Sequence, residues 1–488
     1  MSLDAFRAFV LAFAAHAAKS SKEDIERLIQ GSQLRISSLD SQIKSLVEIR
    51  DRERACVAAL RYLISPIHTL PVELLIEIFK LSIDDVTHIE DAFRISQVCS
   101  HWRRTAHNSP RLWTRPLEVD VGKSKKSTRA YADGLKTWLG RSAPLPLDIT
   151  LLLDSTGVSR RILEEVLRIS LRWRALLFDW EGYEPPPLSL VSRLAECRLD
   201  SLEELDLGRD AIVRDIDIPD LPSFAAAPNL QVLTICIESN ALICGMPWAQ
   251  LIYLHLECYS SPDDALDILA QCANLESASI RIRGWESDGL AANRDMITLT
   301  NLDDLSIPFC GLEEHVTPFF GSLSAPALTT LSLDFSDMQG GLQWTKAYLT
   351  EFQLRAPNIT RLVFHYGGLT PEDFTTALRY TPSLAELELN ACHYFDNTVI
   401  SALSYEDEVK PLASCLHHLV LSHIHERFTA DNLAGMLASR WWTDASELAT
   451  RLDPPVVRWT YLNFEGFRGQ LRDRMAVLQR EGLPIRLK

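Results

Sequence analysis

Residues 383–390 read Ser-Leu-Ala-Glu-Leu-Glu-Leu-Asn, with leucines at positions 384, 387 and 389. The same spacing of apolar residues recurs along most of the chain. Its nine clear copies begin at Leu202, Leu230, Leu251, Leu275, Leu302, Leu328, Ile359, Leu384 and Leu416. The copies follow one another at a mean interval of about 27 residues, which is typical of proteins built from repeated structural units.

Each copy predicts a short strand, because apolar and polar residues alternate in it. Weaker copies with the same spacing are Trp173/Leu176/Phe178 before the array and Val456/Trp459/Tyr461 after it. Further strands are expected at 117–121 and 147–153, and helices at 263–272, 345–355, 371–380 and 431–440. The array resembles a leucine-rich-repeat solenoid of irregular type with ten to thirteen units. The resemblance implies an α/β fold over residues 117–488, with a parallel sheet on the concave side and helices outside.

The residues between the pattern positions of each strand point away from the core, because side chains alternate along a strand. As candidate target contacts on this face we select Glu204, Asp206, His255, Glu257, Asp304, Asp334, Arg361, Glu386 and Glu388. Glu386 and Glu388 should lie close to Arg361 and His418 on the flanking strands. Two interpretations remain open: a solvated acidic sheet, or a groove that selects target proteins with a basic patch.

Residues 22–64 contain no proline and carry apolar residues at heptad spacing. The stripe comprises Ile36, Leu39, Ile43, Leu46, Val57, Leu60 and Ile64, and Arg50 and Glu53 interrupt it. This pattern predicts either a coiled coil that joins two copies of the chain or a single helix folded onto the rest of it. Residues 1–21 are Ala-rich and apolar, and predict a packed or interfacial helix, with a targeting segment as the alternative.

Residues 65–116 form a short segment with more large apolar residues than a unit of this size can bury. A helix should begin near Leu70-Pro71, because proline is tolerated in the first turn. A second helix is expected at 90–107, and Leu112-Trp113 closes the segment. The surplus apolar surface must therefore contact something else, inside the chain or outside it.

This segment resembles an F-box domain in its Leu-Pro-x-Glu-Leu opening at Leu70, its Ile78-Phe79 pair, its Val98-Cys99-x-x-Trp102 motif and its closing Leu112-Trp113. Together with the preceding helix, it is similar to F-box proteins of mushroom-forming fungi. The resemblance implies a small all-α domain that docks on a Skp-family adaptor and, through it, on a cullin. The residues it assigns to the adaptor are Leu70, Pro71, Leu74, Ile78, Val98 and Trp102. Phe79, Leu112 and Trp113 are divided between this interface and the interior.

The composition disfavours several classes of function. The net charge is −16, which disfavours nucleic-acid binding despite a locally basic stretch at 101–129. The ten cysteines contain no Cys-x-x-Cys pair, so they predict reduced thiols and a cytoplasmic or nuclear protein. We expect Cys310 and Cys392 to be structural, and a metal site at His417, His418, His423 and His425 to be absent. No apolar run is long enough for a membrane span, and no catalytic or cofactor motif appears.

The sequence therefore predicts a protein that is not an enzyme and that uses no cofactor or metal. The first hypothesis is a substrate-recognition subunit of a Skp–cullin–F-box ubiquitin ligase, whose repeat domain holds the target. The alternative is a scaffold or assembly protein that uses the coiled coil and the repeats without ubiquitination. Co-purification with the adaptor and the cullin separates the two.

Overall fold

The computed structural model divides into two units, Met1–Thr87 and His88–Lys488, which are described separately. It describes residues 7–8, 10–12, 14, 22–122, 128–153, 157–180, 190, 193–194, 196–208, 224, 227–237, 246–258, 261–285, 294–312, 315–339, 342, 344–367, 369–405, 412–424, 427–441 and 456–488. Most of the apolar segment predicted at 1–21 lies outside the described residues.

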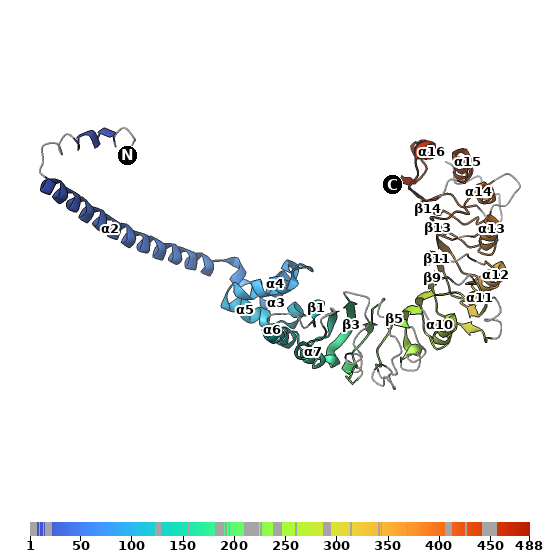
Figure 1. The fold of residues 1–488 in the computed structure, drawn as a ribbon, viewed down its shortest axis with the longest axis horizontal. Helices are drawn as coiled ribbons and strands as arrows, with labels where there is room; N and C mark the ends of the chain where they lie inside the picture. The colour runs from blue at the N-terminus through green and yellow to red at the C-terminus, as the bar shows by residue number, and fades with distance from the viewer. Residues whose placement is uncertain are drawn as a thin grey trace. The chain divides into compact units, whose positions relative to one another are not determined.

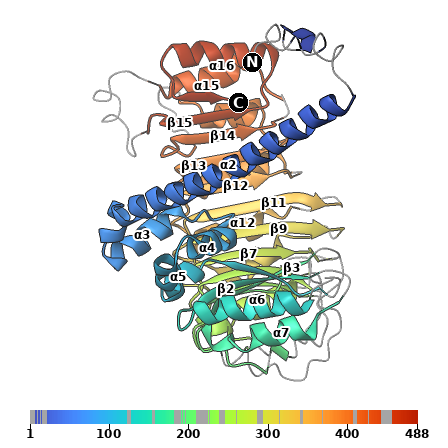
Figure 2. The same cartoon turned by 90° about the vertical axis from the view of Figure 1, so that its left-hand side faces the viewer.

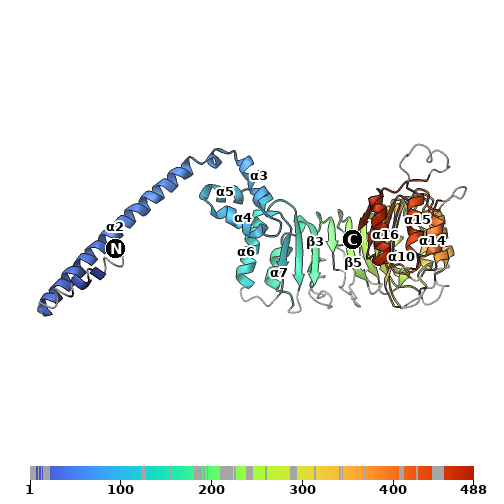
Figure 3. The same ribbon diagram turned by 90° about the horizontal axis from the view of Figure 1, so that it is seen from above.

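The first unit is dominated by one long helix, α2 (Lys22–Leu63). It runs without a break (Figure 3) and buries none of its residues. Ser65-Pro66 follows it as expected, because the residue before a proline avoids helical geometry. A 3₁₀ turn, η1 (Pro66–Thr69), leads to α3 (Val72–Ser82), with Pro71 at the N-cap. A helix over this segment, which both interpretations of residues 22–64 share, is present, and the choice between a coiled coil and a helix folded onto the chain stays open.

The second unit opens with α4 (His88–Gln97), α5 (Ser100–His107) and η2 (Pro110–Trp113). These elements pack on α6 (Thr128–Arg141) through an aromatic cluster. The rings of Trp113 and Trp138 meet edge to face at 4.8 Å, and the Arg141 guanidinium lies 4.6 Å from the Trp113 ring. Such contacts add about 0.5–1.5 kcal/mol each to the burial of apolar area.

The rest of the second unit is built on a parallel sheet, to which the described residues contribute fourteen strands. Figure 2 shows the strands between residues 277 and 465 side by side, in the order in which they pair. The fourteen strands are β1 (Leu117–Asp120), β2 (Leu147–Leu153), β3 (Trp173–Trp180), β4 (Glu204–Asp206), β5 (Val232–Ile237), β6 (Tyr253–Cys258), β7 (Ser277–Ile282), β9 (Asp304–Gly311), β11 (Thr330–Met338), β12 (Arg361–His365), β13 (Glu386–Asn390), β14 (His418–Ser422), β15 (Tyr461–Glu465) and β16 (Ile485–Leu487).

Helices cover one side of this sheet, as Figure 1 shows for α10 to α16. They are α7 (Arg160–Leu167), α10 (Pro262–Leu269), α11 (Pro318–Gly321), α12 (Lys346–Arg355), α13 (Pro371–Arg379), α14 (Asn397–Leu403), α15 (Ala430–Ser439) and α16 (Gly469–Arg480). Short turns η3 (Ser170–Arg172) and η5 (Trp248–Gln250) replace helices elsewhere, and β8 (Ile297–Thr298) pairs with β10 (Leu323–Ser324). This arrangement confirms the predicted α/β, leucine-rich-repeat-like solenoid.

The repeat pattern sets the register of the sheet. Leu331, Leu362, Leu387, Leu419 and Leu462 stand opposite one another on successive strands. These leucines are fully buried, so the apolar face of each repeat is covered by its neighbours.

Two details of the sequence interpretation were wrong. The copy at β15 is Trp459/Leu462/Phe464, with all three residues buried, and not Val456/Trp459/Tyr461, which has the same spacing. A fourteenth strand, β16, follows at the C-terminal end of the sheet. The array therefore has one more strand than the upper limit of thirteen units.

Three arginines tie neighbouring repeats together through backbone carbonyls. Arg440 is fully buried and donates to the carbonyl oxygens of Ser414 at 3.0 Å and Leu416 at 2.7 Å. Its guanidinium also lies 4.7 Å from the ring of Trp459. Arg355 and Arg172 make equivalent bonds to carbonyls of the preceding repeats. Burial lowers the pKa of Arg440 to about 10, so the side chain stays charged at neutral pH.

Candidate partner-binding surfaces

The first candidate surface is one face of α3. Leu74 is 53% exposed and Ile78 is 40% exposed, and both lie on the same side of the helix because they are four residues apart. Leu81, one turn further, is also exposed. On the other side of α3, Leu75 and Phe79 are buried. At the entrance to the helix, Leu70 is half-buried and Pro71 is exposed.

The second candidate surface is the corner between α4 and α5. Val98 is exposed there and Trp102 is half-buried. Cys99 caps α5, since its Sγ accepts a hydrogen bond from the backbone N–H of Trp102 at 3.4 Å. This bond fixes the first turn of the helix and so holds Trp102 in place.

The three residues that had been divided between interface and interior all belong to the interior. Phe79, Leu112 and Trp113 are buried. Trp113 donates from Nε1 to the carbonyl oxygen of Ala106 at 2.8 Å, which satisfies its only polar group.

The third candidate surface is the side of the sheet opposite its helices, where the nine predicted target residues lie. Arg361 is exposed on it, and six acidic residues are half-buried: Glu204, Asp206, Asp304, Asp334, Glu386 and Glu388. His255 and Glu257 are only 8% and 4% exposed. These two residues therefore offer little surface to a partner, and a direct target contact by them stays a prediction.

Around β12 and β13 the acidic side chains are paired. Arg361 binds Glu386 at 3.3 Å and Glu388 at 3.1 Å through different guanidinium nitrogens. His418 approaches Glu386, with 3.8 Å between Nδ1 and Oε1. The neighbours predicted for the two glutamates are therefore confirmed, and the charge of this part of the face is partly balanced within the protein.

Two residues that the sequence interpretation missed extend this cluster. The Tyr461 ring on β15 packs at a tilt against His418, with 4.3 Å between ring centroids, and the Arg486 guanidinium lies 5.0 Å from the Tyr461 ring. Arg486 was missed because β16 was not predicted, and Tyr461 because it had been placed in the core. Burial lowers the pKa of His418, so this ring is neutral at physiological pH.

On the first strands of the sheet, acidic side chains outnumber basic ones. Arg174 binds Asp148, with 2.8 Å between Nε and Oδ1, while Glu204 lies nearby on β4. Burial raises the pKa of Glu204, and the charges of Asp148 and Asp206 raise it further. In the middle of the sheet, burial raises the pKa of Asp304, with a smaller contribution from Asp303. Mutual repulsion of this kind favours the approach of a positive charge.

A second ion-pair group crosses the middle of the sheet. Glu257 lies 3.5 Å from both His255 and Arg281, and Arg281 binds Asp337 at 2.5 Å. Because Glu257 is buried among these groups, it joins the strands rather than presenting a charge to solvent.

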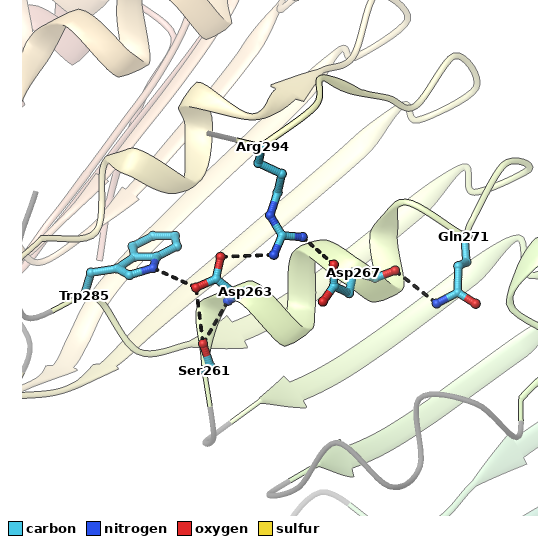
Figure 4. Close-up of polar contacts among 6 residues, drawn as sticks. All are labelled: Ser261, Asp263, Asp267, Gln271, Trp285 and Arg294. Atoms are coloured by element: carbon cyan, nitrogen blue, oxygen red, sulfur yellow. Dashed lines mark hydrogen bonds and ion pairs between the residues drawn. The ribbon is translucent and has the colours of Figure 1, made fainter. Parts of the chain in front are cut away.

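A surface hollow of about 680 Å³ lies beside α10, on the helix side of the sheet. Figure 4 shows Arg294 reaching between Asp263, at 3.1 Å, and Asp267, at 2.6 Å. Asp263 also accepts hydrogen bonds from the Trp285 ring nitrogen at 3.2 Å and from its own helix cap, Ser261. With two carboxylates on one guanidinium, the group holds the 294–299 segment to α10.

The two cysteines expected to be structural, Cys310 and Cys392, are buried and bonded within the repeats. Cys392 is buried, and its thiol donates to the Phe364 carbonyl at 3.4 Å; Cys310 does the same to Ile282 at 3.5 Å. Burial raises the pKa of Cys272 and of Cys392 to about 12. Of the four histidines weighed as a metal site, His425 is outside the described residues and His423 occupies a left-handed turn. Among described side chains, no three His, Cys, Asp or Glu residues gather as metal ligands would.

One comparison with known proteins identifies a domain of the chain. Residues 67–118 match the F-box-like family, so the chain carries an F-box-like domain there. The search of curated proteins found no match to the sequence. Within the part of the chain that the structure describes, no helix combines the length and the apolar character that crossing a bilayer requires.

Two solved structures share similarity with the chain. One is the leucine-rich repeat-containing protein LegL7 from Legionella pneumophila, at 14% identity and a TM-score of 0.26, over 54% of this chain and 97% of that one. The other is TLR13 in a complex with ssRNA13, at 16% identity and a TM-score of 0.25, over 58% of this chain. The match spans 54% of the TLR13 chain, about half of its length.

Proposed function

We propose that the protein is a substrate-recognition subunit of a Skp–cullin–F-box ubiquitin ligase. The observation that carries the proposal is the exposed apolar face of α3, Leu74 and Ile78, inside a segment that matches the F-box-like family. Contact of leucine and isoleucine side chains with water is unfavourable, so a partner that covers them lowers the free energy of the complex. Leu70, Pro71, Val98 and Trp102 complete the set proposed to contact a Skp-family adaptor.

In this role the protein carries out no bond chemistry of its own. The adaptor joins it to a cullin, and the repeat domain holds the target. Holding both in one assembly raises the effective concentration of target lysines near the ubiquitin-conjugating enzyme. Because this role consists of bringing the target close to the ubiquitin-conjugating enzyme, it needs no cofactor or metal.

For the target surface we propose the sheet face opposite the helices. Its half-buried carboxylates at Glu204, Asp206, Asp304 and Asp334 favour a partner with Lys or Arg on its surface. Glu386 and Glu388 are held by Arg361, so a basic partner must compete with that arginine for them. We propose a cytoplasmic or nuclear location, in keeping with the reduced cysteines.

The test is affinity purification of the full chain from cells with the proteasome inhibited. The adaptor and the cullin are expected to co-purify with the wild-type chain and to be lost with the Leu70→Ala/Pro71→Ala double variant. Each buried anchor of an interface contributes about 1–3 kcal/mol. Leu354→Ala is the matched control, because Leu354 is an exposed leucine on α12. Equal recovery of the adaptor with the double variant would contradict the proposal.

A target identified in this way allows a test of the sheet face. Glu204→Gln/Asp304→Asn should weaken capture of the target and reduce its dependence on salt, because exposed charges are screened within about 10 Å at 0.1 M ionic strength. Glu351→Gln on α12 is the control, since it removes a carboxylate from the opposite side of the sheet. Unchanged capture at both low and high salt would exclude an electrostatic role for these carboxylates.

The second candidate function is a scaffold without ubiquitination, which the exposed stripe of α2 favours. The same purification separates the two functions. A scaffold would retain target proteins but neither adaptor nor cullin.

A further inference from the structure

The long helix α2 carries an apolar stripe that the other described residues of its own unit leave exposed. The stripe residues Leu39, Ile43, Leu46, Val57, Leu60 and Ile64 are between 47% and 80% exposed, and α2 has no buried residue. Most of the stability of a protein helix comes from packing its apolar face. A helix of this length, about 63 Å at 1.5 Å per residue, therefore requires a partner.

The two charged residues within the stripe identify the partner. In heptad notation Ile36, Ile43, Arg50, Val57 and Ile64 occupy the a positions, and Leu39, Leu46, Glu53 and Leu60 the d positions. Arg50 and Glu53 thus fall in the middle of the seam. At present Arg50 contacts the adjacent Asp51 at 2.9 Å in an exposed pair, which contributes little and is easily exchanged.

A parallel pairing of two copies is disfavoured by these charges. In register, it places Arg50 against Arg50 and Glu53 against Glu53 inside the seam. The flanking Arg35 and Asp40 would attract each other in this arrangement, but they lie at its solvent-exposed edge. Repulsion between like charges inside an interface destabilises the dimer more than an exposed ion pair stabilises it.

An antiparallel pairing turns the same residues into complementary layers, because a positions then face d positions. When paired residue numbers add up to 103, Arg50 faces Glu53 of the second copy and Glu53 faces its Arg50. Every remaining layer is apolar: Leu46 faces Val57, Ile43 faces Leu60 and Leu39 faces Ile64. Beside the seam, Asp40 of each copy meets Arg61 of the other.

We propose that residues 39–64 pair in antiparallel orientation with the same segment of a second copy of the chain. The two Arg–Glu layers at the centre set the orientation and the register, at a cost in stability that the six apolar layers offset. The paired segment is about 39 Å long. Each end of it leads directly into the α3 segment of one copy, so the dimer would present two such segments.

The first test is sedimentation of the full-length chain at micromolar concentration. The wild type is expected to be a dimer. Arg50→Glu places two glutamates in each central layer and should raise the dimer dissociation constant at least about tenfold. Adding Glu53→Arg to it restores complementary layers and should restore the dimer. The control is Arg52→Glu, which makes the same charge change on the outer side of the helix and should leave the dimer unchanged.

The second test measures orientation. In a Cys56→Ser background, Leu39→Cys and Ile64→Cys variants of the full chain are mixed and treated with a short thiol cross-linker. Mass spectrometry should find position 39 linked to position 64. The Leu39→Cys variant alone should not link to itself at position 39, because the two sites are about 38 Å apart in the antiparallel dimer.

Three results would overturn the proposal. They are a wild-type chain that stays monomeric or forms a larger assembly, an Arg50→Glu variant that dimerises as well as the wild type, and efficient linking of position 39 to itself. The last result would establish the parallel arrangement.

Discussion

The helix α2 and the strands of the repeat sheet both carry apolar residues at regular intervals, but these residues are exposed on α2 and buried in the sheet. Leu387 on β13 is 1% exposed, whereas Leu46 on α2 is 64% exposed. The difference lies in the neighbours. β13 has an equivalent strand on either side to complete its core, while the described residues include no second long helix like α2.

A repeated pattern therefore predicts a buried surface without saying which molecule buries it. In the sheet, successive repeats of one chain satisfy the pattern. On α2 and on the Leu74–Ile78 face of α3 the apolar residues remain exposed, and those are the places where we propose partners to bind.

Thiol reactivity should differ most between the two regions. Cys56 on α2 is exposed, whereas burial raises the pKa of the Cys392 thiol to about 12. A shift of that size from the ordinary value of 9.0 lowers the thiolate fraction by about a thousandfold, and only the thiolate reacts. Alkylation at pH 8 followed by peptide mapping should modify Cys56 at least about a thousandfold faster than Cys392. Similar rates would mean that the repeat core opens readily.

The same pKa predicts a dependence of stability on pH. Between pH 9 and about 12 the Cys392 thiol is ionised in the unfolded chain but not in the folded one. The unfolded chain then binds fewer protons, so the free energy of unfolding should fall as the pH rises through this range. Cys392→Ala should reduce that slope in denaturant titrations at pH 8, 9 and 10.

Truncation of matched leucines is the next largest contrast. Leu387→Ala leaves a cavity in the repeat core and should lower the free energy of unfolding of the repeat domain by about 3 kcal/mol. Leu46→Ala removes the same atoms from an exposed site and should change that free energy by less than about 0.5 kcal/mol. Denaturant titration followed by tryptophan fluorescence measures both. A comparable loss in the two variants would show that α2 packs on the repeats.

A substitution of Arg440 measures how much its hydrogen bonds to backbone carbonyls contribute to the stability of the repeat domain. Arg440 makes these bonds through a single nitrogen, Nη2. Arg440→Lys keeps the charge but removes the planar guanidinium that lies over the Trp459 ring, so the carbonyls of the neighbouring repeat lose a well-placed donor. We expect a loss of about 2 kcal/mol in the free energy of unfolding. The control is Arg174→Lys, whose ion pair with Asp148 is exposed and should contribute under about 1 kcal/mol.

The strands were predictable because the apolar positions that mark each strand in the sequence are also the positions that face the core. All nine clear copies of the pattern became strands of the sheet. The last copy was placed wrongly because Val456, Trp459 and Tyr461 match the spacing as well as the true set does, and only pairing with β14 decides between them. β16 was missed because Ile485–Leu487 is too short to show a pattern of its own.

The surfaces were less predictable than the core. The pairing of Glu386 and Glu388 with Arg361 followed from strand register alone. The burial of His255 and Glu257 did not, because their positions in the strand pattern are the same as those of exposed residues. Arg440 and the Trp113–Trp138 cluster depend on contacts between segments far apart in the sequence, which a local pattern cannot reveal.

Direct titration of a purified Skp-family adaptor against the full-length chain tests whether the exposed face of α3 binds the adaptor, as we propose. Leu74→Asp/Ile78→Asp should raise the dissociation constant at least about a hundredfold, since each anchor contributes about 1–3 kcal/mol and an aspartate would be buried without a partner. The free energy of unfolding of the repeat domain should stay unchanged, because both residues are exposed. Equal affinity of the double variant and the wild type for the adaptor would contradict the claim.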